Sequence, residues 1–127
     1  TSVAFDGSGK YLASGSDDNT VRIWDVSTWQ QVAELTGHTN SVTSVAFDGS
    51  GKYLASGSGD KTVRTWDVST QQQVAELRGH TEGVMSVAFD GSGKYLASGS
   101  DDKTVRIWDV STQQQVAELR GHTTGVT

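Results

Sequence analysis

The sequence predicts an all-β fold built from three near-identical units. The first observation is a repeat period of 42 residues, which brings Trp24, Trp66 and Trp108 into register. The second is composition, because 15 glycines and no proline among 127 residues indicate many short, regular turns. The third is pattern, since β-branched and aromatic residues gather in short runs between turn residues. A period of this length is typical of a solenoid or a β-propeller.

Self-comparison divides the chain into three units. These are residues 1–42, 43–84 and 85–127, and the last includes the lead-in to a further unit. The second and third units differ at four positions, which are Thr43/Met85, Gly59/Asp101, Thr65/Ile107 and Glu82/Thr124. Near-identity of this degree is typical of a recently amplified array or of a designed repeat protein.

Each unit is expected to form four strands joined by short turns. In the second unit they are Val42 to Phe47, Tyr53 to Ser58, Thr62 to Val68 and Gln73 to Leu77. The third run is rich in β-branched and aromatic residues, and the fourth is polar on one face, as suits an outer edge. One unit therefore predicts one antiparallel sheet, and the first strand of the chain is expected at Thr1 to Phe5.

Several spaced elements resemble the WD40 repeat. In the second unit they are Gly37-His38, Val45-x-Phe47, Leu54 to Gly57, Asp60-x-Thr62-Val63 and Trp66-Asp67. The resemblance covers the whole chain, with one departure in the turn after the first strand. There the chain has Asp48-Gly49-Ser50-Gly51 where the family has Ser-Pro-Asp-Gly. The resemblance implies a β-propeller of four-stranded blades, usually seven to a ring, that presents loops on one rim to proteins or peptides.

The resemblance also implies one buried hydrogen-bond set of His, Ser, Asp and Trp in each blade. Carried over, the two complete sets are His38, Ser56, Asp60 and Trp66, and His80, Ser98, Asp102 and Trp108. The first unit holds Ser14, Asp18 and Trp24 but no preceding Gly-His, so His122 of another copy is expected to complete an inter-chain set. We expect the Trp indole to donate to Ser, Ser to pair with His, and His to pair with Asp.

His, Ser and Asp are also the components of acyl-transfer catalysis. However, the set recurs in every unit, whereas an active site is usually single, and no nucleophile elbow surrounds Ser56. Residues 49–52 resemble a phosphate loop, but Tyr53 stands where Ser or Thr is needed. Residues 17–19 lack the spaced oxygen ligands of a calcium loop. We therefore predict no enzymatic activity, no metal and no cofactor.

The charge and the apolar pattern restrict the kinds of partner. A net charge of −5 with a pI near 4.9 argues against nucleic acid, and no apolar run reaches the roughly 18–20 residues of a membrane span. We expect protein partners and a cytoplasmic location. The candidate partner contacts are loop positions that vary between units, namely Asp17, Asn19, Lys61, Lys103, Asn40, Glu82 and Thr124. Neutral drift explains this variation equally well, and the unrepeated Trp29 is either a contact or drift.

Three blades are too few for a closed propeller, so other copies are expected to complete the ring. A head-to-tail interface that repeats until it closes would give six blades in a dimer or nine in a trimer. Ordering fewer chains favours the dimer, whereas bulky Trp, Phe and Tyr side chains between blades resist a tighter inner rim and favour the trimer. Two alternatives stay open: a fragment of a longer propeller, and an amplified or designed repeat protein without a ligand.

Overall fold

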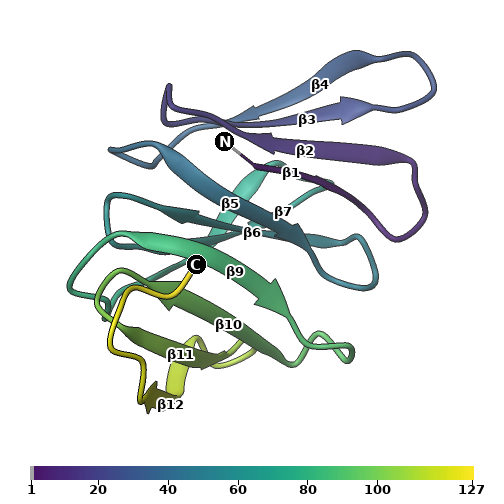
Figure 1. Ribbon diagram of the computed structural model, residues 1–127. Coiled ribbons are helices and arrows are strands. Elements are labelled where there is room, and N and C mark those ends of the chain that lie inside the picture. Colours follow the sequence, from purple (N-terminus) through teal and green to yellow (C-terminus); the bar gives the residue numbers. More distant parts are fainter. Residues whose placement is uncertain (1) are drawn as a thin grey trace.

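The computed structural model describes residues 2–127, which form three four-stranded antiparallel sheets in chain order (Figure 1). We call these sheets blades 1, 2 and 3. Blade 1 consists of β1 (Ser2–Phe5), β2 (Tyr11–Gly15), β3 (Val21–Asp25) and β4 (Gln30–Leu35). Blade 2 consists of β5 (Val42–Phe47), β6 (Tyr53–Ser58), β7 (Val63–Asp67) and β8 (Gln72–Leu77). Blade 3 consists of β9 (Val84–Phe89), β10 (Tyr95–Ser100), β11 (Thr104–Asp109) and β12 (Gln114–Arg120). The all-β prediction is confirmed.

The strand bounds differ little from those expected. In blade 2 the third strand runs from Val63 to Asp67 instead of from Thr62 to Val68, and the Thr62 amide donates to the carboxylate of Asp60 at 3.0 Å in the hairpin before it. The fourth strand begins one residue earlier than expected, at Gln72. The first strand of the chain was expected from Thr1, which lies outside the described residues.

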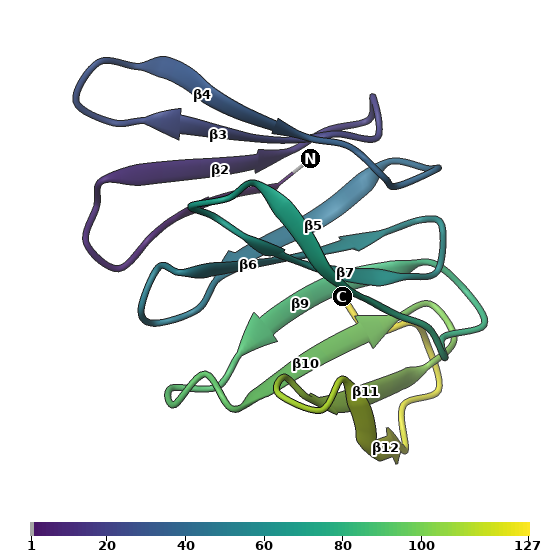
Figure 2. The ribbon, with the colours of Figure 1, turned by 180° about the vertical axis from the view of Figure 1, so that it is seen from behind.

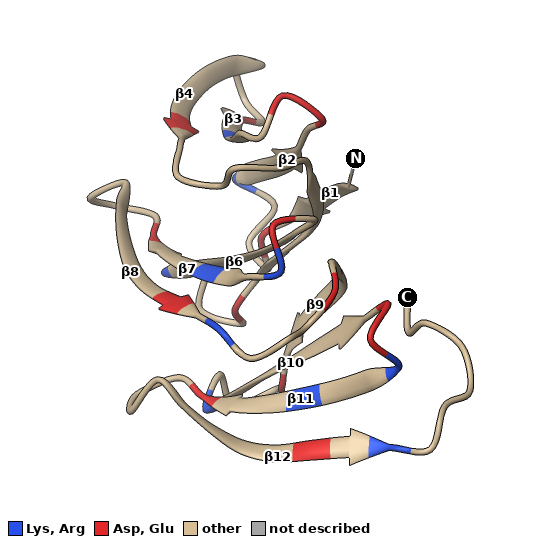
Figure 3. Cartoon of the chain, turned by 90° about the vertical axis from the view of Figure 1, so that its left-hand side faces the viewer, with Lys and Arg blue, Asp and Glu red and all other residues tan. Residues whose placement is uncertain are grey.

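The blades lie one against the next in chain order, and both views of the ribbon show the same stack (Figures 1 and 2). The first strands β1, β5 and β9 lie in contact with their neighbours, whereas the fourth strands β4, β8 and β12 fan apart (Figure 3). Each blade is therefore a wedge, narrow at its first strand and wide at its fourth, as in a propeller.

The apolar core lies between blades. One cluster joins blade 1 to blade 2 and contains Ala13, Val21, Ile23, Ala33, Leu35, Val42, Val45, Leu54 and Trp66. The second joins blade 2 to blade 3 and contains Ala55, Val63, Ala75, Leu77, Val84, Val87, Leu96 and Trp108. Blade 2, which has a neighbour on both sides, thus contributes half of a core on each of its two faces.

A glycine and a valine meet at each joint between blades, near the end of the second strand of one blade and the start of the first strand of the next. A Cβ added to Gly57 would lie 2.7 Å from Cγ1 of Val84, and Gly15 and Gly99 face Val42 and Val126 in the same way. The amide of Val126 also donates to the Ser100 carbonyl at 2.8 Å, as that of Val42 does to Ser16. The C-terminal tail therefore lies on blade 3 in the same way as the start of β5 lies on blade 1.

This close approach predicts a cost for Gly57→Ala. The added methyl overpacks the joint against Val84 and should lower the free energy of unfolding by about 1–3 kcal/mol. The measurement is urea unfolding followed by tryptophan fluorescence. Gly91→Ala is the matched control, because a Cβ there meets no atom within 4 Å. Equal stabilities for the two variants would contradict the predicted tight joint.

Candidate functional site

The structure brings His38, Ser56, Asp60 and Trp66 together as one hydrogen-bonded chain across the joint between blades 1 and 2. His38 Nε2 lies 2.7 Å from Ser56 Oγ, and His38 Nδ1 lies 2.9 Å from Asp60 Oδ2. The Trp66 indole donates to Ser56 Oγ at 2.9 Å. The second set repeats this geometry, with 2.7 Å from His80 to Ser98, 2.8 Å from His80 to Asp102 and 2.9 Å from Trp108 to Ser98.

The direction of donation follows from the groups present. The Trp66 indole can only donate, so Ser56 accepts from it and is left with its own hydrogen for Nε2 of His38. His38 must then carry its proton on Nδ1 and donate it to Asp60. The set is therefore consistent with a neutral imidazole, and every polar atom in it has a partner.

Thr62 and Thr39 also bind the carboxylate, and sequence reasoning did not assign them a role. The Thr62 hydroxyl donates to Asp60 Oδ1 at 2.6 Å, and the Thr39 amide donates to Oδ2 at 3.0 Å. The sequence signal for these two contacts was the recurrence of Asp-x-Thr and His-Thr in the units. Gly37 precedes the histidine at φ 153°, and a Cβ there would lie 2.9 Å from Arg64 Nη1, so glycine is required at this crossing.

Burial and hydrogen bonding separate the charge states of the two ionisable groups. Burial lowers the pKa of His38 and of His80, and the neighbouring carboxylates only partly oppose it. Burial alone would raise the pKa of Asp60, but hydrogen bonds from Thr62, His38 and the Thr39 amide together lower that pKa to about 2. The pKa of Asp102 is lowered by the equivalent bonds. At neutral pH the pairs thus consist of a neutral imidazole and a carboxylate.

Blade 1 holds an incomplete set. The Trp24 indole donates to Ser14 at 3.0 Å, as in the other blades, but no histidine lies beside Ser14 within the described residues. Asp18 instead lies 3.2 Å from Arg22, whereas the equivalent pairs in blades 2 and 3 are 4.0 Å apart. His122 is exposed, in the tail that follows β12 of blade 3. The four residues of the expected inter-chain set are therefore not brought together within one chain.

The third-strand arginines form a structural row. Arg64 Nη2 pairs with Glu76 on the next strand at 2.9 Å, and its Nη1 donates to Gln73 at 2.8 Å. Arg106 makes the same contacts with Glu118 and Gln115, and Figure 3 shows the acidic and basic positions of β11 and β12 side by side. Both guanidinium groups are buried, and they bind the fourth strand of the blade to the third.

The candidate partner contacts lie on one edge of the stack, where two sets of loops meet. The β6–β7 hairpin touches the loop before β5, since Gly59 donates its amide to Ser41 at 3.0 Å and faces the Asn40 side chain. All but one of the candidate positions are exposed, namely Asp17, Lys61, Lys103, Asn40, Glu82 and Thr124. Asn19 is half-buried in the equivalent hairpin of blade 1.

The chemistry of the sets is that of a structural link. Ser56 is fully buried and its hydroxyl is shared between Trp66 and His38, so a substrate carbonyl cannot reach it while the blades stay in contact. Among residues 2–127, no group of three or more His, Cys, Asp or Glu side chains could hold a metal ion. In the same part of the chain, no helix is long and apolar enough to cross a membrane.

Wedge-shaped blades of four antiparallel strands pack face to face through apolar clusters, and a buried polar set links each connecting loop to the blade that follows it. This arrangement defines a β-propeller protein. The chain belongs to the WD40 family. The family described as WD domain, G-beta repeat matches residues 1–25, 29–67 and 71–109.

Individual relatives share segments of this chain. It is 46% identical over 43 residues to the guanine nucleotide-binding protein subunit beta of Dictyostelium discoideum, covering 34% of this chain and 12% of that protein. It is 49% identical over 45 residues to Elongator complex protein 2 of the same organism, covering 32% and 5%. Among solved structures, U3-55K is 27% identical with a TM-score of 0.95 over 98% of this chain and 40% of that one. The chain thus spans well under two thirds of each of these relatives.

The buried set predicts a large effect of His80→Ala. This change leaves Ser98 and Asp102 without their shared partner in a buried site, which should lower the free energy of unfolding by about 1–3 kcal/mol. Denaturant unfolding measures the difference. The control is Thr81→Ala, which removes only an exposed side chain and keeps the amide bond to Asp102. Unchanged melting of His80→Ala would rule out the structural role.

The lowered pKa values of His38 and His80 predict weaker folding in mild acid. The unfolded chain takes up protons near pH 6.5 and the folded chain only at lower pH, so stability is full above pH 6.5 and falls below it. A second loss should follow below about pH 3.8, where Asp60 protonates in the unfolded chain but stays ionised in the folded chain, in which its pKa is about 2. Urea unfolding between pH 7.5 and 3 measures both steps. Replacing both histidines by Gln should remove the loss of stability below pH 6.5. A wild-type stability that stays constant from pH 7.5 to 5.5 would contradict the prediction.

Proposed function

We propose that the chain is a non-catalytic propeller scaffold for protein interactions, and that copies join head to tail into a closed ring. The partners would be proteins or peptides that bind the edge formed by the hairpins and the loops before the first strands. That edge carries both signs of charge, with Lys61 and Lys103 beside Asp17 and Glu82, so it has no basic face for nucleic acid. The cytoplasmic location stays a prediction from the sequence.

The observation that carries ring closure is the exposure of the two end faces. Val3 on blade 1 is 69% exposed, whereas Val45 and Val87 at the same position are 5% and 6% exposed. On blade 3, Leu119 is 51% exposed, whereas Leu35 and Leu77 are 2% and 5% exposed. Each end therefore presents one half of the joint that the chain makes twice within itself.

The two halves also complement each other in the polar set. Blade 1 offers Ser14, Asp18 and Trp24, and the tail on blade 3 offers His122 and has already placed Val126 against Gly99. If blade 1 of a second copy packed next to this tail, it would make the same contacts that blades 2 and 3 make with the blades before them. An interface between different surfaces of one molecule repeats until it closes a ring.

Closure with whole chains gives six or nine blades. Nine blades need a turn of about 40° per blade and six need about 60°. The Trp and Phe side chains that fill the joints resist the sharper turn, so we favour the trimer. The alternative is a longer chain in which further blades are covalently attached, and it agrees with the small share of each relative that this chain spans.

Mass in solution tests ring closure. Sedimentation equilibrium of this chain should give three times the 13.5 kDa of one chain, or twice that mass for six blades. Val3→Asp should return the protein to a single chain, because it places a charge in the apolar joint but lies exposed in the free chain. Lys103→Ala, on an exposed hairpin, is the control and should keep the wild-type mass. A wild-type mass of 13.5 kDa up to high concentration would contradict ring closure.

A further inference from the structure

Trp29 is the residue of blade 1 that the fold explains least. It is 64% exposed, although tryptophan buries more apolar surface than any other side chain when it finds a partner. It also has a positive φ of 56°, a conformation that bulky residues rarely adopt. The β3–β4 turn requires this conformation, since Gln71 and Gln113 have φ of 61° and 62° at the equivalent positions. Nothing in the turn itself favours tryptophan over glutamine.

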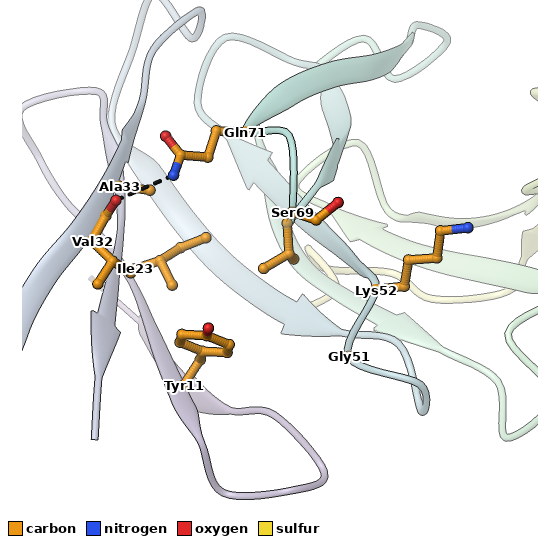
Figure 4. A pocket seen from close by; sticks show the side chains of 9 residues that line it. Tyr11, Ile23, Val32, Ala33, Gly51, Lys52, Ser69 and Gln71 are labelled. Atoms are coloured by element: carbon orange, nitrogen blue, oxygen red, sulfur yellow. Dashed lines mark hydrogen bonds between the residues drawn. The ribbon is translucent and has the colours of Figure 1, made fainter. Parts of the chain in front are cut away.

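The equivalent residues show what this position faces. Gln71 Nε2 donates to the carbonyl of Val32 on β4 of the preceding blade at 3.2 Å (Figure 4). Gln113 reaches the carbonyl of Val74 on β8 in the same way, at 3.5 Å. The turn before the fourth strand therefore reaches back across the seam and touches the outermost strand of the blade before it.

Each internal seam leaves an open cavity beneath this glutamine. The cavity between blades 1 and 2 measures about 280 Å³ and is lined by Tyr11, Ile23, Val32 and Gln71, among others (Figure 4). The cavity between blades 2 and 3 measures about 300 Å³ and includes Tyr53, Thr65, Val74 and Gln113. Each glutamine lines its cavity without filling it.

We propose that Trp29 is the anchor of the joint between copies and seats in the seam cavity of a second copy of this chain, against Val116. This inference rests on the proposed ring closure and names the contact that distinguishes the joint between chains from the two joints within a chain. At a joint between copies, position 29 faces the blade 3 residues that correspond to the lining of the internal cavities. They are Tyr95, Ile107, Val116 and Ala117.

The chemistry of that face fits an indole. Ile107 is half-buried, whereas the equivalent Ile23 is only 1% exposed in the closed joint of blade 1. Val116 is 52% exposed on β12, and the equivalent Val32 and Val74 stay 43% and 45% exposed beside the glutamines of the closed seams. An indole in this cavity would cover apolar surface that a glutamine leaves in contact with water. The two blades of a joint within a chain are connected by a covalent linker, whereas those of a joint between chains are not. A stronger contact at position 29 would therefore compensate for the missing linker.

The experiment compares wild type with Trp29→Gln, which restores the residue that the same turn carries in blades 2 and 3. Sedimentation equilibrium over a range of concentrations gives the dissociation constant between copies. We expect that constant to rise at least about tenfold in Trp29→Gln, as for other buried tryptophan anchors. The urea midpoint of the separated chain should not fall, because glutamine suits the turn. Gln71→Ala is the control, since it alters a seam within the chain and should leave the constant unchanged.

A double-mutant cycle with Val116→Ala identifies the partner residue. If Trp29 seats against Val116, the two changes together should weaken association by less than the product of their separate effects. Fully independent effects, or an unchanged dissociation constant in Trp29→Gln, would overturn the Trp29 contact while leaving ring closure intact. A wild-type chain that stays monomeric, with Trp29 open to acrylamide quenching, would overturn both proposals.

Discussion

The structure depends on the joint between consecutive blades, because a single four-stranded sheet cannot bury either of its faces alone. The joint combines two interactions of different range. Apolar side chains of one blade pack on those of the next, and Gly57 makes room for Val84, because a Cβ on Gly57 would lie 2.7 Å from Val84 Cγ1. Around this contact, a histidine from the connecting loop binds a serine and an aspartate of the next blade. The loop is thereby fixed at both ends.

This joint explains why residues at equivalent positions of the repeat differ in burial and in charge pairing. Val3, Val45 and Val87 occupy the same position of the repeat, yet of these three only Val3 is exposed, because no other blade of the described residues packs on that face of blade 1. The same holds for the carboxylates, because Asp60 is held by a histidine while Asp18 turns to Arg22. Burial, charge pairing and the pKa of each aspartate are therefore set by the position of the blade in the stack as much as by local sequence.

The fold could be predicted from the sequence because its signals are local or periodic. The run Val42–Phe47 ends at a glycine-rich turn, and the structure and the sequence agree on the bounds of that strand, although its burial does not alternate strictly because the register shifts between Val42 and Ser44. The hydrogen-bond partners of the sets could be named only through the family resemblance, since Trp66 and His38 are 28 positions apart. The role of Thr62 was missed, although Asp-x-Thr recurs, because a β-branched residue beside a strand reads first as part of that strand.

Contacts across a seam were beyond the reach of the pattern, since Gln71 and Val32 lie 39 residues apart and no sequence rule pairs them. This limit bears directly on Trp29. In the sequence it is one unmatched aromatic, and drift explains it as well as selection does. In the structure the position has a neighbour in each of the two closed seams, and that neighbour is always the outer strand of the preceding blade. The turn imposes the same positive φ on Trp29 as on Gln71 and Gln113, so a large aromatic side chain in place of glutamine is better explained by the seam than by the turn.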